Sequence, residues 1–435
     1  MSRGPGMVTG ACLLAAPLLS LLLVLIPFGG APEHVVNGVT FVTLGSGWAA
    51  IAFLTTRHTQ PQQWALRPAL LLIAGGVVSL GWAGSVGNAI VSWSWPAALL
   101  GLVAYAWVQA RRHLRSRVRR RVLHPALVAL VLVAVAGTYE TVAEARDARA
   151  HPFPGRLIEV HGRRLHLDCR GHHGPTVVLI SGFGELSSDW AWIAEDVRRD
   201  TRVCAYDPAG RAWSDAAEAP QDGIARARDL HDLLRSAGEA GPYVLVGHSL
   251  GGLYARIFAA QYPGQVAGMV LLDATHPDMF RLPSYPGTYE VYRRVSALFP
   301  SLARLGLGRL AYATARAGLP RPAREEVRAF SSTARLFRDL RDEWTEAPTA
   351  MAQARAVTTL GDRPLMVVTA ARGALEGWLP LQGELTELST NAEQRILPEA
   401  DHSGLLEHRD QAVESGRAIR DVVAAVRHAT PLGSS

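Results

Sequence analysis

The N-terminal third of the chain consists of long apolar runs, whereas the remainder alternates short apolar runs with amphipathic stretches. The long runs cover residues 8–28, 35–55, about 68–86, about 90–110 and Val122–Tyr139. An apolar run of about 20 residues is long enough to cross a bilayer as a helix. The pattern therefore predicts a multi-pass, all-α transmembrane region over residues 1–140. It has about five helices, or four if one weak run does not cross.

The first run, residues 8–28, has a second interpretation as a secretory signal peptide. A signal peptide has a shorter apolar stretch and ends at a small-residue cleavage site. Because further apolar runs follow along the chain, we favour a membrane helix that is retained.

The segment before the fifth run is rich in arginine, with Arg111, Arg112, Arg115, Arg117, Arg119, Arg120 and Arg121. Short loops with this composition stay on the cytoplasmic side of a membrane. The fifth helix then runs outward, and everything after Tyr139 is extracytoplasmic. The alternative is a solvated charge run with no bearing on topology.

Composition and charge support a division of the chain near residue 150. The 435 residues are 49% hydrophobic, and a mean hydropathy of +0.10 excludes a disordered chain. Residues 1–150 have 12 arginines against four acidic residues, a balance of +8, and the rest have 32 arginines against 34 acidic residues, or −2. The basic character belongs to the apolar part, so it does not indicate nucleic-acid binding.

The region after the membrane segments has the pattern of an α/β domain over residues 156–430. A charged stretch broken by prolines, residues 141–155, predicts a linker before it. Two alternating runs around His161 and Gly162 predict a hairpin. Short apolar runs predict buried strands at Thr176–Ile180, Val203–Tyr206, Tyr243–Val246, Met269–Leu272 and Leu365–Thr369. Helical patterns separate most of them, which favours a mostly parallel sheet covered by helices.

The stretch at about 278–355 departs from this alternation, because it is rich in arginine, mostly helical in pattern and interrupted by prolines. It lies between two predicted strands. We therefore interpret it as a helical cap inserted into the domain.

A G-x-S-x-G motif, Gly247-His248-Ser249-Leu250-Gly251, follows the Tyr243–Val246 run and precedes a helical stretch. The motif alone is weak, but a strand, sharp turn and helix are the setting of a nucleophile elbow. The glycines Gly247 and Gly251 permit the tight turn, which exposes the Ser249 hydroxyl at a helix N-terminus. The alternative is a Gly-Ser turn without chemistry.

Residues 156–430 resemble the α/β-hydrolase superfamily, in its esterase-like or lipase-like serine hydrolase branch. The resemblance rests on LHLDCRG, PTVVLISGFGELSSDW, RVCAYDPAGRAWSD, the long segment from GPYVLVGHSLGG to VLLDATHP, and ADHSGLL. It does not extend to residues 1–150. It implies an α/β-hydrolase fold and a Ser-His-acid triad in the chain order serine, acid, histidine.

Carried onto this sequence, the resemblance assigns Ser249 as the nucleophile and His402 as the base. The acid is Asp273, at the end of the Met269–Leu272 run, or else Glu376, the nearest acid after the Leu365–Thr369 run. In the family the acid follows either the sixth or the seventh strand. Asp273 has the alternative role of a loop cap.

The same resemblance implies the remaining parts of the site. The N–H groups of Leu250 and Phe183 form the oxyanion hole, and the side chain of His248 points away from the nucleophile. The segment Asp207–Ser214 departs from the usual family motif, with Pro208 in place of an arginine and Arg211-Ala212 in the region of the second glycine.

Two of the three cysteines fall on strands that are neighbours in this fold. Cys169 ends the second strand and Cys204 lies in the fourth. An extracytoplasmic domain would permit a disulfide between them. The alternative is two small buried thiols.

These features predict a membrane-anchored serine hydrolase that cleaves carboxylic esters through an acyl-enzyme. A serine argues against epoxide hydrolase and dehalogenase chemistry, which needs a carboxylate at position 249. The expected partners are a small-molecule or lipid-like ester substrate and membrane lipids, with no nucleic acid, cofactor or metal. The alternatives are an acyltransferase or peptidase with the same triad, or a catalytically silent binding or sensory module.

Overall fold

The computed structural model describes residues 5–58, 61–81, 85–113, 117–313 and 316–433. The chain forms two compact units. The helical unit comprises Met1–Arg146 together with Val291–Leu310, and the sheet unit comprises Asp147–Glu290 together with Ala311–Ser435. Parts of the third predicted run (residues 82–84) and of the arginine-rich segment (residues 114–116, with Arg115) lie outside the described residues.

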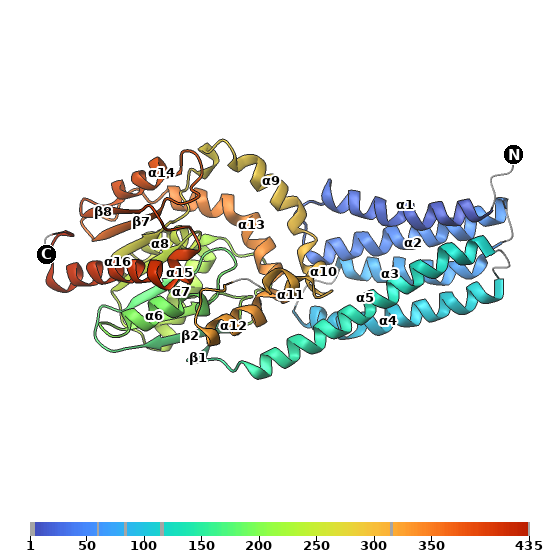
Figure 1. The fold of residues 1–435 in the computed structure, drawn as a ribbon, viewed down its shortest axis with the longest axis horizontal. Helices are drawn as coiled ribbons and strands as arrows, with labels where there is room; N and C mark the ends of the chain where they lie inside the picture. Colours follow the sequence, from blue (N-terminus) through green and yellow to red (C-terminus); the bar gives the residue numbers. More distant parts are fainter. Residues whose placement is uncertain (1–4, 59–60, 82–84, 114–116, 314–315, 434–435) are drawn as a thin grey trace. The chain divides into compact units, whose positions relative to one another are not determined.

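The N-terminal part of the helical unit has the five expected helices (Figure 1). These are α1 (Pro5–Leu25), α2 (Glu33–His58), α3 (Leu66–Gly81), α4 (Ser85–His113) and α5 (Arg117–Ala150). Among the described residues, three segments are long and apolar enough to cross a membrane: Glu33–Arg57, Gln63–Gly81 and His124–Ala150. Gly10–Leu25 is a shorter apolar helix.

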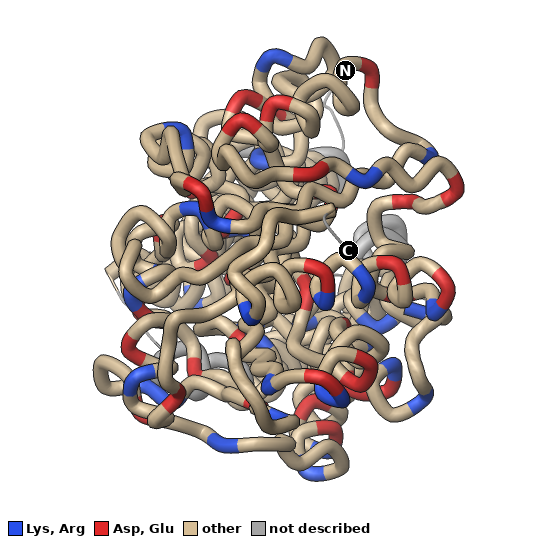
Figure 2. The backbone as a smooth tube through the Cα atoms, turned by 90° about the vertical axis from the view of Figure 1, so that its left-hand side faces the viewer, with Lys and Arg blue, Asp and Glu red and all other residues tan. Residues whose placement is uncertain are grey.

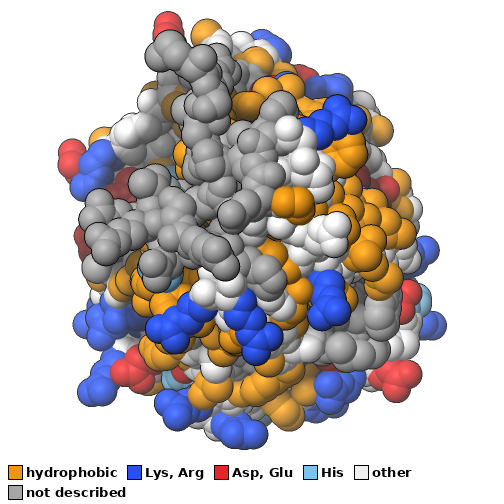
Figure 3. Space-filling view, turned by 90° about the vertical axis from the view of Figure 1, so that its right-hand side faces the viewer, with side chains coloured by type: hydrophobic (Ala, Val, Ile, Leu, Met, Phe, Trp, Pro, Cys, Tyr) orange, Lys and Arg blue, Asp and Glu red, His pale blue; other side chains and the backbone are white. Residues whose placement is uncertain are grey.

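Large apolar side chains point outward from these helices. Leu14 on α1 is 75% exposed, Leu71 on α3 is 69% exposed, and Leu132 on α5 is 64% exposed. The face in Figure 3 has hydrophobic side chains beside arginine side chains. Exposed apolar surface of this extent is typical of a surface that contacts a membrane or another protein, and not of one that faces solvent.

Helix α5 continues through most of the predicted linker at 141–155. It ends at Ala150, and only residues 151–155 connect it to the first strand. Alanine, glutamate and arginine are strong helix formers, and they prolong the helix until Pro152 and Pro154. The charged pattern that predicts a linker is equally compatible with a solvated helix end.

The helical unit also includes residues 291–310, which the sequence pattern assigned wholly to the cap. Ala297 is fully buried with Val24 and Val36. Nε of Arg304 lies 2.6 Å from Oε1 of Glu33, and Nε of Arg309 lies 2.6 Å from Oε2 of Glu140. Both carboxylates are buried, and buried charges are stable only when paired.

The sheet unit is built on a single sheet of eight strands in the order β1-β2-β4-β3-β5-β6-β7-β8. The strands are β1 (Arg156–Val160), β2 (Arg163–Arg170), β3 (Val177–Ile180), β4 (Val203–Asp207), β5 (Tyr243–His248), β6 (Val266–Leu272), β7 (Leu365–Ala370) and β8 (Ala392–Leu397). β2 is antiparallel to β1 and β4, and β3 to β8 pair in parallel. The sheet is therefore mostly parallel, as predicted.

Helices cover both faces of this sheet (Figure 1). They are α6 (Ala191–Val197), α7 (Gly223–Ala237), α8 (Gly251–Gln261), α14 (Trp378–Glu384), α15 (Gly404–Glu407) and α16 (Arg409–His428). On one face Leu245 of β5 packs with α7 and α8 residues, and on the other Val244 and Val246 pack with α6 and α16 residues. Because both faces are buried, the central strands are continuously apolar.

The chain between β6 and β7 forms the helices of the cap: α9 (Tyr285–Ser296), α10 (Phe299–Ala303), α11 (Leu307–Tyr312), α12 (Arg321–Ser331) and α13 (Ala334–Arg355). Helix α13 packs against α7 and α8 of the sheet unit. Acidic and basic residues are interspersed along the sheet unit (Figure 2). This mixture agrees with the small net charge of residues 151–435.

Candidate active site

Ser249 occupies a strained turn between β5 and α8. Its φ is +53°, a left-handed conformation that non-glycine residues rarely adopt and that is characteristic of a nucleophile elbow. A Cβ atom at Gly247 would lie 2.5 Å from the carbonyl oxygen of Gly251, and one at Gly251 would overlap the carbonyl oxygen of Ile180. Strand and helix backbones therefore approach too closely for any other residue at these two positions.

Hydrogen bonds join the Ser249 turn to the loop after β6. The N–H of Ser249 donates to the carbonyl of Leu272 (3.2 Å), and the N–H of Thr275 donates to the carbonyl of Ser249 (2.9 Å). Asp273 lies between these two partners, with φ of +40°. The backbone thus holds the Asp273 loop beside the Ser249 turn.

The carboxylate of Asp273 faces the ring of His402. Oδ2 of Asp273 lies 2.6 Å from Nδ1 of His402, and Asp273 is only 3% exposed. Oδ1 accepts hydrogen bonds from Nε1 of Trp378 (2.8 Å) and from the N–H of Ala370 (3.2 Å). With Nδ1–H donating to a carboxylate, Nε2 of His402 is the nitrogen that can accept a proton.

The alternative acid Glu376 has a different setting. It lies exposed in the loop after β7, whereas the Asp273 carboxylate is buried and contacts His402. Trp378, two residues beyond Glu376, supplies a hydrogen bond to Asp273. The structure therefore pairs His402 with the acid after β6.

The loop after β3 runs directly against the Ser249 turn. A Cβ atom at Gly182 would lie 2.7 Å from Cβ of Ser249 and 2.8 Å from the carbonyl oxygen of His248. Phe183 follows this glycine, and Leu250 precedes the first residue of α8. Backbone N–H groups at these positions are those that an oxyanion hole requires.

Comparison with known proteins decides the family. A family model described as the alpha/beta hydrolase fold matches residues 175–409, which is more than half of the chain. The chain belongs to the α/β-hydrolase family.

The relatives of this α/β hydrolase include proteins named epoxide hydrolase 4 and proteins without an assigned activity. Epoxide hydrolase 4 of Mus musculus is 32% identical over 148 residues, which cover 33% of this chain and 39% of that protein. An uncharacterised protein of Schizosaccharomyces pombe is 34% identical over 153 residues, 28% of each chain. The alignments span less than half of these curated relatives.

Among solved structures, the Cif epoxide hydrolase of Acinetobacter nosocomialis matches with a TM-score of 0.55. The match covers 66% of this α/β hydrolase and 96% of that chain, at 17% identity. A putative alpha/beta hydrolase of Nostoc has a TM-score of 0.53 at 18% identity. At such identities these likenesses support the fold alone.

Sequence reasoning missed the partner of His248. The ring of His248 is buried, with Nδ1 2.5 Å from Oε1 of Glu185 and Nε2 3.0 Å from the carbonyl oxygen of His402. Both ring nitrogens face acceptors, so both carry protons and His248 is an imidazolium. The G-x-S-x-G motif marked His248 as a neighbour of the nucleophile, but nothing in the sequence linked it to Glu185.

Electrostatics keep this buried pair ionised. Burial raises the pKa of the Glu185 carboxyl, but the charge and hydrogen bond of His248, the charge of Arg316 and the N–H of Gly182 outweigh this, and the net pKa falls to about 2. Burial lowers the pKa of His248, and Glu185 reverses the shift so that the pKa is raised. The other oxygen of Glu185 accepts from the N–H of Gly182 at 2.6 Å. The pair thus fixes the loop beside Ser249.

The atypical segment after β4 has a structural and an electrostatic role in this α/β hydrolase. Asp207 accepts hydrogen bonds from the N–H of Ser187 (2.8 Å) and from Nδ1 of His166 (2.7 Å). Ser214 donates its hydroxyl proton to the carbonyl of Asp207 (2.6 Å). Arg211, in the region of the usual second glycine, is completely buried. This segment thus contributes a buried cation.

A disulfide joins Cys169 on β2 to Cys204 on β4. These residues are register partners in the antiparallel pair. Glu239 lies near the two sulfur atoms, but disulfide sulfurs are not thiolates and do not provide the anionic ligands that a metal requires.

A second group with metal-ligand chemistry, His276, Asp278 and Glu384, also does not fit a metal ion. Nδ1 of His276 accepts from the N–H of Asp278 (3.0 Å), so the proton lies on Nε2, the nitrogen that faces Glu384. Arg355 pairs with Asp278, and Arg281 pairs with Glu384. The carboxylates are already neutralised, and the imidazole has no lone pair to offer.

Proposed function

We propose that this α/β hydrolase is a serine hydrolase that cleaves carboxylic esters. The observation that carries the proposal is the contact between Asp273 and His402 beside the strained Ser249 turn. Nε2 of His402 takes the hydroxyl proton of Ser249 as the oxygen attacks the ester carbonyl. Asp273 holds the ring orientation and stabilises the imidazolium that forms.

The backbone supplies the rest of the chemistry. The N–H groups of Leu250 and Phe183 stabilise the oxyanion of the tetrahedral intermediate. His402 then returns the proton to the leaving alcohol, and an acyl-enzyme remains on Ser249. Water, activated by the same imidazole, attacks the acyl carbonyl and releases the acid.

The nucleophile type favours esters over the epoxides named in the relatives' titles. A carboxylate that opens an epoxide forms an alkyl ester, which water can hydrolyse at the carbonyl. A serine that opened an epoxide would form an ether, which this machinery cannot hydrolyse. Ser249 can therefore complete a catalytic cycle on an acyl substrate but not on an alkyl one.

Membranes that contain the full-length protein provide the test. A fluorophosphonate probe is expected to label wild type, to fail with Ser249→Ala and to label His402→Ala much more slowly. Hydrolysis of p-nitrophenyl butyrate should follow the same order, with no turnover of styrene oxide. Absence of labelling and ester turnover in folded wild type would overturn the proposal in favour of a silent binding module. Transfer of the acyl group to an added alcohol or amine would identify an acyltransferase.

We also propose that the apolar helices anchor the protein in a membrane, with the hydrolase domain on the extracytoplasmic side and lipid-like esters as substrates. The exposed leucines of the helical unit support the anchoring. The disulfide supports the orientation, because disulfides persist in oxidising compartments. A C-terminal alkaline phosphatase fusion should be active and a C-terminal green fluorescent protein fusion dark. The reverse result would place the domain in the cytoplasm.

A further inference from the structure

Arg211 lies buried between the loop after β3 and helix α13 of the cap. Its Nη1 donates to two carbonyls of that loop, Gly182 at 2.7 Å and Glu185 at 3.0 Å. Its Nε donates to Oδ2 of Asp339 at 2.7 Å, and its Nη2 donates to Oε2 of Glu343. The guanidinium therefore joins a loop beside the nucleophile to two carboxylates one helical turn apart.

The contact with Gly182 acts on the peptide that matters for catalysis. The carbonyl of Gly182 and the N–H of Phe183 belong to one peptide unit, which is planar and points these groups in opposite directions. A donor that fixes the carbonyl thereby aims the N–H. A positive charge on the carbonyl oxygen also polarises the peptide and strengthens its N–H as a donor.

We propose that Arg211 is a positioning residue that holds the Gly182–Phe183 peptide in the orientation needed for the oxyanion hole. This inference rests on the proposed esterase function.

The surroundings of Arg211 keep its charge permanent. Burial alone would lower its pKa, but the carboxylates of Glu343 and Asp339 raise it above the ordinary arginine value. A guanidinium presents its donors in a planar fork and can serve several acceptors at once. A lysine ammonium at the same place would have one nitrogen to serve acceptors that lie in separate directions.

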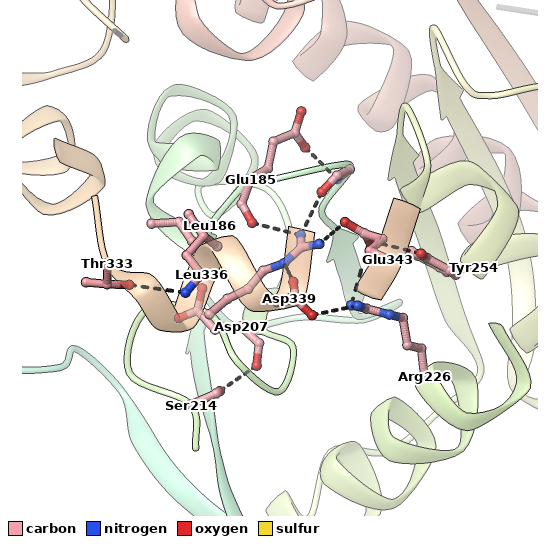
Figure 4. Close-up of polar contacts among 12 residues, drawn as sticks. Glu185, Leu186, Asp207, Ser214, Arg226, Tyr254, Thr333, Leu336, Asp339 and Glu343 are labelled. Carbon is pink, nitrogen blue, oxygen red and sulfur yellow. Dashed lines mark hydrogen bonds and ion pairs between the residues drawn. The ribbon is translucent and has the colours of Figure 1, made fainter. Parts of the chain in front are cut away.

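The cap takes part in this arrangement through α13. Figure 4 shows Asp339 and Glu343 on one helix, with Arg226 and Tyr254 directed toward them. The ring of Phe183 also packs edge-to-face on Trp344, the residue after Glu343, with centroids 5.2 Å apart. The position of α13 therefore contributes to the orientation of the oxyanion loop.

Arg226 provides a matched control. It contacts the same carboxylates, with Nη2 2.7 Å from Oδ1 of Asp339 and Nη1 3.7 Å from Oε1 of Glu343. Within the described part of the chain, Arg226 hydrogen-bonds and pairs with these acids and lies over the ring of Tyr254, whereas Arg211 also donates to the loop after β3. Arg211→Lys and Arg226→Lys therefore make the same change of side chain in the same ionic cluster.

The experiment measures p-nitrophenyl butyrate hydrolysis by full-length protein, inhibition by a trifluoromethyl ketone that forms a tetrahedral adduct with serine, and Tm. For Arg211→Lys, kcat should fall by at least about tenfold at unchanged KM. The inhibition constant should rise by a similar factor. Arg226→Lys should lower Tm while kcat changes by less than about twofold. Equal kcat effects of the two variants, or a rise in KM alone, would overturn the inference.

If Arg211→Lys does not fold, Glu343→Gln tests the positioning role of Arg211. This variant keeps Arg211 but removes the charge of one of the two carboxylates that hold its guanidinium. A lower kcat at unchanged KM supports the positioning role, and an unchanged kcat in folded protein overturns it. Wild type and Ser249→Ala are assayed alongside. Their difference tests the esterase proposal separately from the role of Arg211.

Discussion

Glu185 and His248 form an ion pair that is buried next to the nucleophile, with Oε1 of Glu185 2.5 Å from Nδ1 of His248. The pair is not a second acid–base dyad, because both nitrogens of His248 face acceptors. Its role is structural. The carboxylate of Glu185 accepts a hydrogen bond from the N–H of Gly182, and Nε2 of His248 donates one to the carbonyl of His402. One ion pair thus connects the loop after β3 with the loop that carries His402.

This pair should make stability depend on pH in a defined window. The pKa of Glu185 falls from 4.5 to about 2 on folding, so its stabilisation is complete above pH 4.5 and is lost as pH falls toward 2. The pKa of His248 is raised above 6.5, so its stabilisation is complete below pH 6.5 and is lost at higher pH. The contribution should peak between about pH 4.5 and 6.5.

Glu185→Gln tests this expectation, because the amide oxygen still accepts from Gly182 while the charge is removed. Breaking a buried ion pair costs on the order of 3 kcal/mol, so Tm at pH 5.5 should fall by several degrees. The difference from wild type should shrink at pH 3 and at pH 9. Glu195→Gln, in an exposed pair with Arg198, is the control. A Tm difference constant across this pH range would contradict the ionised pair.

The acid of the triad can be tested by Asp273→Asn. The amide would favour the wrong tautomer of His402 and fail to stabilise the imidazolium, so kcat should fall by about 10³- to 10⁴-fold. Glu376→Gln, which changes the other candidate acid in an exposed loop, should leave kcat within about twofold. Steady-state kinetics of the two variants decide between the acids. Loss of activity in Glu376→Gln would reverse the assignment.

Gly182→Ala should separate the oxyanion loop from the nucleophile. The added methyl group would stand 2.7 Å from Cβ of Ser249, so the loop must move away. We expect kcat to fall by about 10²-fold at nearly unchanged KM. Gly264→Ala, at a glycine where a Cβ meets no atom within 4 Å, is the control. Equal kinetics in both variants would show that the loop accommodates the added methyl group without moving from Ser249.

The disulfide should contribute to the stability of the sheet unit. Cys169 and Cys204 are separated by 35 positions, and closing such a loop stabilises the fold by about 3–4 kcal/mol in the chain-entropy treatment. The double variant Cys169→Ala/Cys204→Ala should therefore have a lower Tm than wild type. Dithiothreitol should lower Tm only in wild type. A wild-type Tm insensitive to reduction would contradict a structural disulfide.

Local patterns in the sequence predicted seven of the eight strands but not the edge strand β8. The hairpin and the five apolar runs each correspond to observed strands, because a buried parallel strand is apolar at every position. Strand β8, AEQRIL, is not among the predicted strands. It is an edge strand with three polar or charged residues, so alternation and apolarity were both weak.

The sequence also singled out Ser249, His402 and Asp273 as a candidate triad, because each lies at a strand end or in a family motif, and His402 contacts Asp273 in the structure. It did not find Glu185, Trp378 or the contacts of Arg211 with α13. Arg211 and Glu343 are 132 positions apart, and their pairing depends on how the cap folds back. A pattern among neighbouring residues does not indicate a contact between residues so far apart in the sequence.

The order in which the chain is synthesised affects when the helical unit can be completed. Residues 291–310 complete the helical unit, where Arg304 and Arg309 pair with Glu33 and Glu140. Synthesis begins at the N-terminus, so residues 291–310 are made only after the first five helices and six of the eight strands. Removing the first 146 residues to obtain an isolated hydrolase would take away the packing partners of that segment. The two units are thus joined in biosynthesis as well as in covalent structure.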